Sequence, residues 1–481
     1  MEVAAAYLAE HRERHMEELF RFLRIPSVSL NPGGADQLRE AADYSAQLLR
    51  EAGLQRVEVL QTRGAPLVYG VRKQALDVPT VLVYGHYDVQ PAGPEERWTT
   101  SAFAPQIRSG AIYGRGASDD KGQLFLHVKA IEAILQTGLS LAFNVVFLLE
   151  GEEETGSVAL RSLLSGISPD GTVSATTLTG EEITLDLRVD AVVISDTPFM
   201  SPDEPALCVG VRGFCGLLAE VEGPAADLHS GGYGGLVHNP AHALARMLGG
   251  LHDEDGRVAV ADFYRDVQEL PADERARLRR ATPPEEELAR QLGVAELYGE
   301  SGYSVLERVW TRPTLDVNAF LAGDCAEAVR TIIPRAARAT VTARLVPGQD
   351  PQVVVAALEQ HMRQAVPKGV KLRLTRLDDA RPWSAAGDQA AHRHALAALS
   401  YGFSKQASAI RMGGSIPVVA DFAERLRAQV VLLGFGLPSD QVHAEDEHLD
   451  LRQFESGLRT LLYYYHTAWD HAQGDESQDG A

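Results

Sequence analysis

Cysteine is scarce in this sequence, with only three among 481 residues. Cys208, Cys215 and Cys325 form no CxxC pair, and an odd number of cysteines cannot all be joined in disulfides. We therefore expect these side chains to be small core residues in a protein of a reducing compartment.

Long apolar runs and an excess of positive charge are also missing. No segment approaches the length of a membrane span, and the first residues lack the basic start, apolar run and small-residue cleavage site of a signal peptide. The net charge of −21 argues against a nucleic-acid or anionic-membrane partner, because phosphate binding depends on clustered Lys and Arg. The expected location is cytoplasmic.

The chain is long enough for two or more domains with real cores, at 45% hydrophobic residues. Short, continuous apolar runs alternate with helical patterns, which predicts an α/β fold with a mixed, largely parallel sheet covered by helices. The apolar runs that we interpret as buried strands are 81–84, 144–149, 191–194 and 430–433.

Each of these strands delivers His, Asp or Glu at or just beyond its carboxyl end. Sheets of this kind bind ligands outside the carboxyl ends of their strands. Side chains from distant parts of the sequence are therefore expected to converge, namely His86, Asp119, Glu153 or Glu154, Asp196 and His443.

Between residues 206 and 381 the pattern changes to a β-α-β-β-α-β arrangement, which predicts an inserted α+β, ferredoxin-like domain. The expected catalytic domain is then discontinuous, 1–205 and 382–481. The charged stretch 253–307 is interpreted as a helical elaboration of the insert, and the polar tail after His471 as unstructured.

The acidic turn Glu150–Glu154 concentrates four carboxylates within five residues, and their repulsion must be relieved by solvent or by a cation. A solvated turn before a helix is one interpretation. The glycine-rich segment 114–122 has neither the GxxxxGK[ST] nor the GxGxxG spacing, and its paired aspartates would oppose a phosphate.

Two imidazoles and several carboxylates without a thiolate make a nitrogen and oxygen site suited to Zn²⁺, Mn²⁺ or Co²⁺. A bridging carboxylate can hold two such cations about 3.5 Å apart, and the hydrolysis they support needs a free carboxylate as proton shuttle. Adjacent glutamates supply both, since one can ligate while the other stays free. Asp88 is placed to orient the ring of His86, whereas the residues after His443 could also be a solvated loop.

Four motifs, taken together and in this order, closely resemble the metallopeptidases typified by carnosinase, cytosolic dipeptidase and carboxypeptidase G. The superfamily also includes aminoacylase, acetylornithine deacetylase and succinyl-diaminopimelate desuccinylase. The motifs are Gly85-His86-Tyr87-Asp88, Gly114-Arg115-Gly116-Ala117-Ser118-Asp119-Asp120-Lys121-Gly122, Glu150-Gly151-Glu152-Glu153-Glu154-Thr155-Gly156-Ser157 and Gly413-Gly414-Ser415-Ile416-Pro417.

The resemblance implies a zinc-peptidase type of fold and a role for each candidate. Two divalent cations per subunit are expected, with Zn²⁺ favoured over Mn²⁺ or Co²⁺. His86 and Asp196 would ligate one cation, Glu154 and His443 the other, and Asp119 would bridge them, with a cis peptide bond after it. Glu153 would be the general base toward a bridging water, and Asp88 the partner that orients His86.

The resemblance also implies that the insert is a lid and dimerisation domain. In the homodimer, His229 would reach the partner's active site and stabilise an oxyanion. Thr331, Arg344 and Ser415 match substrate-binding positions of the dipeptidases, and Arg344 suits a free carboxylate. Each of these four residues could also be an ordinary loop, turn or strand residue.

These expectations lead to a dipeptidase that hydrolyses dipeptides or short peptides with a free C-terminal carboxylate. A deacylase of N-acyl amino acids is the enzymatic alternative, with the same metals and a different lid pocket. A non-catalytic binding protein of the same fold is a remote alternative, since it predicts a broken set of ligands and every candidate position here carries a competent residue.

Overall fold

The computed structural model describes residues 1–31, 33–323, 330–387 and 389–469. The predictions for Cys325 and for the tail after His471 lie outside this part of the chain. The chain groups into two compact units. The first comprises residues 1–209, 385–410 and 421–481, and the second comprises residues 210–384 and 411–420.

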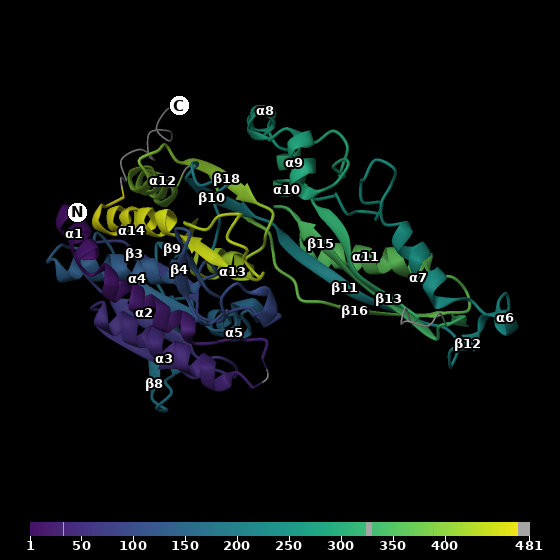
Figure 1. The fold of residues 1–481 in the computed structure, drawn as a ribbon, viewed down its shortest axis with the longest axis horizontal. Helices are drawn as coiled ribbons and strands as arrows, with labels where there is room; N and C mark the ends of the chain where they lie inside the picture. The colour runs from purple at the N-terminus through teal and green to yellow at the C-terminus, as the bar shows by residue number, and fades with distance from the viewer. Residues whose placement is uncertain (32, 324–329, 388, 470–481) are drawn as a thin grey trace. The chain divides into compact units, whose positions relative to one another are not determined.

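A mixed sheet forms the centre of the first unit (Figure 1), and its strands follow the order β1-β2-β6-β3-β9-β19-β10. Strand β3 runs parallel to β6 and β9, and β9 runs parallel to β19, whereas β1, β2 and β10 run antiparallel to their neighbours. The strands are β1 Arg56–Leu60, β2 Leu67–Arg72, β3 Thr80–His86, β6 Asn144–Glu150, β9 Ala191–Ile194, β10 Ala206–Val211 and β19 Gln429–Leu432.

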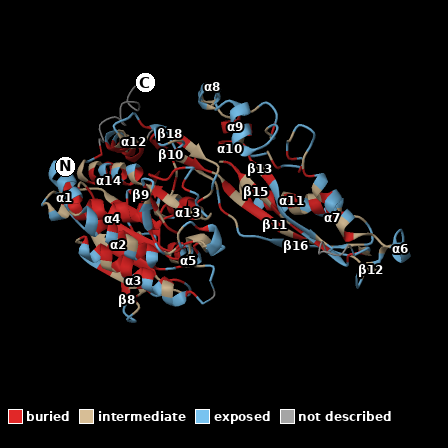
Figure 2. Ribbon diagram, viewed as in Figure 1, coloured by how far each residue is buried: buried red, intermediate tan, exposed pale blue. Residues whose placement is uncertain are grey.

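All four predicted apolar strands are therefore present and parallel to one another as β3, β6, β9 and β19. Their side chains are buried because helices cover both faces of the sheet. Gly85 of β3 lies against α4, where a Cβ would approach Leu124 to 3.1 Å, and the ring of Tyr84 packs against Phe422 of α13. Figure 2 shows α4 among the most buried helices of this unit.

Helices alternate with the strands of the first unit, as the helical patterns predicted. Their bounds are α1 Glu2–Glu10, α2 Arg12–Arg24, α3 Ala35–Glu51, α4 Lys121–Gln136, α5 Val158–Ser165, α12 Ala390–Phe403, α13 Pro417–Leu426, which crosses the boundary between the units, and α14 Leu451–His466. Among the described residues, every helix is too short or too polar to span a bilayer.

Short strands complete the first unit. A three-stranded sheet has the order β20-β5-β4, and residues 172–186, for which no element was predicted, form the hairpin β7-β8. The bounds are β4 Gln106–Arg108, β5 Ala111–Tyr113, β7 Thr172–Thr176, β8 Glu182–Asp186 and β20 His448–Asp450.

The second unit has the predicted β-α-β-β-α-β order, formed by β11, α7, β13, β15, α11 and β16. Its sheet is antiparallel in the order β13-β15-β11-β16. The bounds are β11 Gly213–Glu222, α7 Pro240–Gly249, β13 Thr314–Ala322, β15 Ala336–Leu345, α11 Pro351–Ala365 and β16 Lys371–Arg376.

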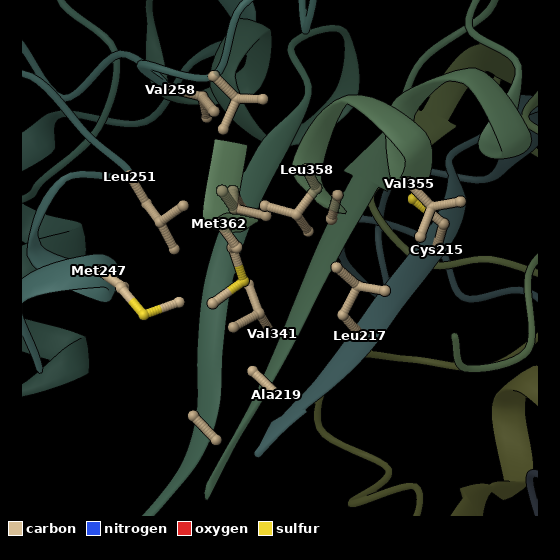
Figure 3. Packing of buried hydrophobic residues seen from close by; sticks show 14 of the residues in the cluster. Cys215, Leu217, Ala219, Met247, Leu251, Val258, Val341, Val355, Leu358 and Met362 are labelled. Carbon is tan, nitrogen blue, oxygen red and sulfur yellow. The ribbon is translucent and has the colours of Figure 1, made fainter. Parts of the chain in front are cut away.

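Both long helices of this unit pack on one face of its sheet. Leu358 and Met362 of α11 and Met247 of α7 meet Leu217 of β11 and Val341 of β15 in one apolar cluster (Figure 3). Alternate residues of β15 point into this cluster, so the remaining residues, which include Arg344, lie on the opposite face of the sheet.

The remaining elements of the second unit are short. The predicted helical elaboration is confirmed as α8 Ala272–Ala281, α9 Glu285–Leu292 and α10 Val305–Trp310. The others are β12 Leu228–His229, α6 Ser230–Tyr233, β14 Ile332–Ile333, β17 Trp383–Ser384 and β18 Ser408–Met412, whose first three residues belong to the first unit. Cys208 and Cys215 are buried, as predicted.

Candidate metal centre

The candidate metal ligands of the first unit lie at the carboxyl ends of its parallel strands. His86 is the last residue of β3, Glu153 and Glu154 follow β6 in a 3₁₀ turn, and Asp196 follows β9 by two residues. Asp119 comes just before α4, and its peptide bond to Asp120 is cis. His443 stands in the long loop between β19 and β20.

Asp119 lies between two imidazoles. Its Oδ1 is 3.0 Å from His86 Nε2, and its Oδ2 is 2.8 Å from His443 Nε2. The same His443 nitrogen is 3.3 Å from Glu154 Oε2. Two groups of possible ligands therefore share one carboxylate, His86 with Asp119 and Asp196, and Asp119 with Glu154 and His443.

Asp88 connects His86 to the acidic turn. Nδ1 of His86 lies 3.0 Å from the carbonyl oxygen of Asp88 and 3.4 Å from its Oδ1. The two carboxylate oxygens of Asp88 accept hydrogen bonds from the backbone N–H groups of Glu153 and Glu154, both at 3.2 Å. A single buried carboxylate thus fixes the imidazole and the turn that carries the two glutamates.

The other two acids of the turn have structural partners. Glu152 accepts hydrogen bonds from the N–H groups of Ala65 at 3.1 Å and Ala159 at 3.0 Å, which ties the turn to its surroundings. Glu150 accepts a 2.6 Å hydrogen bond from the Tyr84 hydroxyl, and burial raises its pKa to about 8. The turn is therefore not the solvated acidic loop that was one interpretation of its sequence.

The electrostatics of the cluster favour a bound proton or cation. Burial raises the pKa of Asp196 well above its ordinary value, and the charges of Asp119 and Asp120 add to the effect. Burial also raises the pKa of Glu153 to about 8, with the neighbouring acids contributing. Hydrogen bonds that His443 donates to Asp119 and Glu154 raise the pKa of His443 to about 10.

The arrangement fits divalent cations. His86 Nε2 and Glu154 Oε1 are buried without a hydrogen bond, although Asp119 Oδ1 lies 3.0 Å from the first. A buried polar atom without a hydrogen-bond partner needs an explanation, and each of these two atoms belongs to a residue in one of the groups of possible metal ligands. Imidazole and carboxylate donors without thiolate suit Zn²⁺, Mn²⁺ or Co²⁺.

Two residues near these ligands were not singled out in the sequence. Gln90 donates a 2.7 Å hydrogen bond from Nε2 to Glu154 Oε2. Glu447 has no exposed surface and accepts hydrogen bonds from the loop that carries Asp119. The run Glu445–His448 is thus more than a solvated loop. The signal available was a glutamate four residues after His443, which is too common to identify alone.

The predicted substrate-binding residues lie in the second unit, where they form two pairs. His229 pairs with Ile332 across β12 and β14, next to Thr331, whose carbonyl oxygen accepts from the Ser230 N–H at 3.0 Å. Arg344 of β15 donates a 2.9 Å hydrogen bond from Nη1 to the hydroxyl of Ser415. Residues far apart in the sequence are thus neighbours within this unit.

The chain matches the sequence model of a family described as peptidase family M20/M25/M40, over residues 82–467. The chain belongs to this peptidase family. It is a metallopeptidase, which confirms the resemblance stated from the four motifs.

Individual relatives support the same assignment over nearly the whole chain. The Cys-Gly metallodipeptidase of Schizosaccharomyces pombe is 28% identical over 468 residues, covering 95% of each chain. The Beta-Ala-His dipeptidase of Rattus norvegicus is 27% identical, covering 94% of this chain and 88% of its own. The solved structure of the dipeptidase Dug1p from Saccharomyces cerevisiae has a TM-score of 0.81 at 27% identity, covering 97% and 98% of the two chains.

Metal binding is expected to release protons at pH 7.5. His443 holds a proton there because its pKa is raised to about 10, and a ligating imidazole must be neutral, so about one proton should leave this residue. Affinity for the metal should therefore rise with pH. Calorimetric titration with Zn²⁺ in buffers of different ionisation enthalpy measures the proton count.

The control for this titration is a His443→Gln variant, which should bind one ion fewer and release fewer protons. A binding enthalpy that is independent of the buffer, or an affinity that falls as pH rises, would contradict the expectation.

Proposed function

We propose that this chain is a dipeptidase that hydrolyses the amide bond of dipeptides or short peptides with a free C-terminal carboxylate. The observation that carries the proposal is the carboxylate of Asp119 between the imidazoles of His86 and His443, with Glu153 beside it in the acidic turn. The names of the aligned relatives, a Cys-Gly and a Beta-Ala-His dipeptidase, support the substrate class.

Two divalent cations, with Zn²⁺ as the proposed metal, would be held by the two groups of ligands that share Asp119. When bound, a pair of such ions lowers the pKa of a water molecule toward about 7 and polarises the carbonyl of the scissile bond. His86 and Asp196 are assigned to one ion, and Glu154 and His443 to the other. Asp88 holds His86 and the turn in place.

Glu153 is assigned as the general base. Its neighbours are acids, and burial raises its pKa to about 8, so its carboxylate has a strong affinity for a proton. It would take the proton of the attacking water and deliver it to the nitrogen of the leaving amine. Because Glu154 occupies the adjacent position and points to His443, the two glutamates have separate tasks.

The second unit offers a binding site for the C-terminal carboxylate of the substrate. Arg344 and Ser415 are hydrogen-bonded to each other, and no ion pair joins Arg344 to an acid among the described residues. A second guanidinium, that of Arg212, lies nearby, and burial together with the charge of Arg344 lowers its pKa to about 10. The charge of Asp316 acts on the pKa of Arg212 in the opposite direction, but two neighbouring guanidinium groups still favour an anionic ligand.

A homodimer is the proposed assembly, with the second unit as lid and dimerisation domain. Strand β13 is an edge of its sheet among the described strands, and it exposes Val317, Phe320 and Leu321 at 45%, 45% and 53%. A long edge strand with exposed apolar side chains favours pairing with another chain. His229 is exposed and would reach the partner's active site. The cytoplasmic location stays a prediction.

A substrate panel tests the proposed activity against its alternatives. Purified protein reconstituted with Zn²⁺ should cleave Cys-Gly, β-Ala-His or other dipeptides with a higher kcat/KM than N-acetyl or N-succinyl amino acids. Deacylation without dipeptide cleavage would support the deacylase instead. If both ions are bound and no substrate is hydrolysed, the result would support the remaining alternative, a non-catalytic binding protein of the same fold.

Replacing Glu153 by Gln should remove the base and keep the metals. We expect kcat to fall by about 10²- to 10⁴-fold, the range of general acid–base catalysis, with two ions still bound by elemental analysis. The matched control is Glu132→Gln, which neutralises a buried acid of the first unit whose partners include Arg14 and Lys129 and no candidate metal ligand, and which should keep most of the activity. Full turnover of Glu153→Gln with two ions bound would refute the assignment.

Arg344→Gln should weaken binding of the substrate carboxylate selectively. The loss in kcat/KM on a dipeptide should be about 10- to 100-fold, from one charged hydrogen-bonding group. The corresponding dipeptide amide lacks this carboxylate and should be a poorer substrate for the parent enzyme. Its kcat/KM should therefore fall little further in the variant. Arg338→Gln, an exposed position on the same face of β15, is the control. An equal loss on acid and amide would remove the proposed contact.

Mixing two inactive variants tests whether His229 acts across the dimer. A 1:1 mixture of Glu153→Gln and His229→Ala chains, unfolded and refolded together, should recover about a quarter of the parent activity, because half of the dimers carry one complete site. If His229 acts within its own chain, every site stays defective. The mixture would then be as inactive as each variant alone.

A further inference from the structure

The loop that carries His443 adopts an unfavourable backbone. Three of its non-glycine residues have positive φ angles, 55° at Gln441, 63° at His443 and 60° at Asp446. Side-chain-bearing residues rarely adopt this region, and they keep it only where surrounding contacts determine the conformation. The loop must therefore be held by its neighbours.

Two acids of the loop provide part of that support. Asp440 is fully buried, and its Oδ2 accepts hydrogen bonds from the Ser118 hydroxyl at 2.7 Å and the Leu437 N–H at 2.9 Å. Asp446 accepts from the Thr99 N–H at 3.0 Å and from Arg108 at 2.7 Å. The first of these contacts reaches the loop that carries Asp119.

Glu447 makes the most extensive connection between the two loops. It has no exposed surface, and all its partners donate hydrogen bonds to it. Its Oε2 accepts from Arg115 Nη1 at 2.7 Å, both oxygens accept from the Gly116 N–H at 3.1 Å, and Oε1 accepts from the N–H groups of Ser118 at 3.0 Å and Asp119 at 3.1 Å.

The fold explains why these loops meet. Strands β5 and β20 pair antiparallel with Tyr113 opposite His448, so the residues just after β5 run beside those just before β20. The Gly114 N–H also donates to the carbonyl oxygen of Glu447 at 3.0 Å. The carboxylate of Glu447 therefore accepts hydrogen bonds from the backbone N–H groups of Gly116, Ser118 and Asp119, the last of which belongs to the candidate ligand itself.

We propose that Glu447, assisted by Asp440, is a positioning residue that fixes Asp119 and His443 relative to each other. The 2.8 Å approach of Asp119 Oδ2 to His443 Nε2 is then built into the apoprotein, and the ion held by Asp119, Glu154 and His443 meets a preorganised site. This role rests on the proposed two-metal function. It does not depend on which peptide is the substrate.

A neutral amide cannot replace this carboxylate. Every partner of Glu447 is a donor, so the NH₂ group of a glutamine at this position would face either Arg115 or the backbone N–H groups of residues 116–119. Glu447→Gln therefore disturbs the connection with almost no change in volume.

The matched control is Glu132→Gln. Glu132 is also buried in the first unit, at 2% exposure, and also binds cationic donors, with Arg14 at 2.5 Å and Lys129 at 2.6 Å. None of its partners is a candidate metal ligand. Loss of stability from neutralising a buried acid should thus occur in both variants, whereas loss of metal affinity should be confined to Glu447→Gln.

The experiment is stepwise titration of the apoproteins with Co²⁺, followed by calorimetry and by the visible absorption of the bound ion. We expect two ions for the parent and for Glu132→Gln. For Glu447→Gln one ion should bind about 10- to 100-fold more weakly, the usual effect of removing a group that orients ligands. Unchanged affinity for both ions in Glu447→Gln, or equal weakening in Glu132→Gln, would overturn the proposal.

A milder variant tests the same connection if Glu447→Gln folds poorly. Ser118→Ala removes only the hydroxyl that joins the Asp119 loop to Asp440, and it should lower the affinity for the same ion by a smaller factor. Normal affinity there would contradict the coupling between the loops. A parent protein that binds fewer than two ions would instead refute the two-metal function, so the two failures are distinguishable.

Discussion

The first unit is organised around the mutual repulsion of buried acids at one edge of its sheet. Asp119, Asp196, Glu153 and Glu154 lie close together, and in the described part of the chain the imidazoles of His86 and His443 lie among them. Burial raises the pKa of Asp196 and of Glu153, and the charges of neighbouring acids add to the effect. A folded chain can keep this arrangement only if protons or cations compensate it, and paired cations do so while leaving one glutamate free for the proton.

Supporting carboxylates extend outward from this point. Asp88 holds His86 and the two glutamates, Glu152 anchors the turn to Ala65 and Ala159, and Glu447 joins the backbone before α4 to the loop of His443. Each accepts hydrogen bonds from backbone N–H groups, so the acids that orient the ligands are satisfied by the main chain. The surrounding network therefore determines the ligand positions before any metal binds.

Much of the fold could be predicted from the sequence, because its continuous apolar runs and helical patterns form strands and helices in the structure. Strands β3, β6, β9 and β19 were identifiable as short Val- and Leu-rich runs, and a parallel arrangement brings their ends together whatever lies between them. The β-α-β-β-α-β order of the second unit was readable for the same reason. The hairpin β7-β8 was not singled out, although its two five-residue strands alternate polar and apolar residues, because the Thr and Gly residues of this segment are typical of loops.

The roles of individual acids were harder to predict, because a buried and a solvated glutamate look alike in sequence. Glu447 stood in a polar run that suggests a surface loop, and only the β5-β20 pairing shows that it lies beneath the Asp119 loop. Gln90 carries no sequence signal apart from its place four residues after His86. The pairing of Arg344 with Ser415 depends on contacts between segments 71 residues apart, which periodicity does not reveal.

The central claim is that one carboxylate serves two cations, and the metal content of an Asp119→Asn variant tests it most directly. Elemental analysis after reconstitution with Zn²⁺ should give two ions per chain for the parent and one for His443→Gln. In Asp119→Asn both sites should bind the metal more weakly. Retention of one tightly bound ion and loss of only the other in Asp119→Asn would contradict a bridging role for this residue.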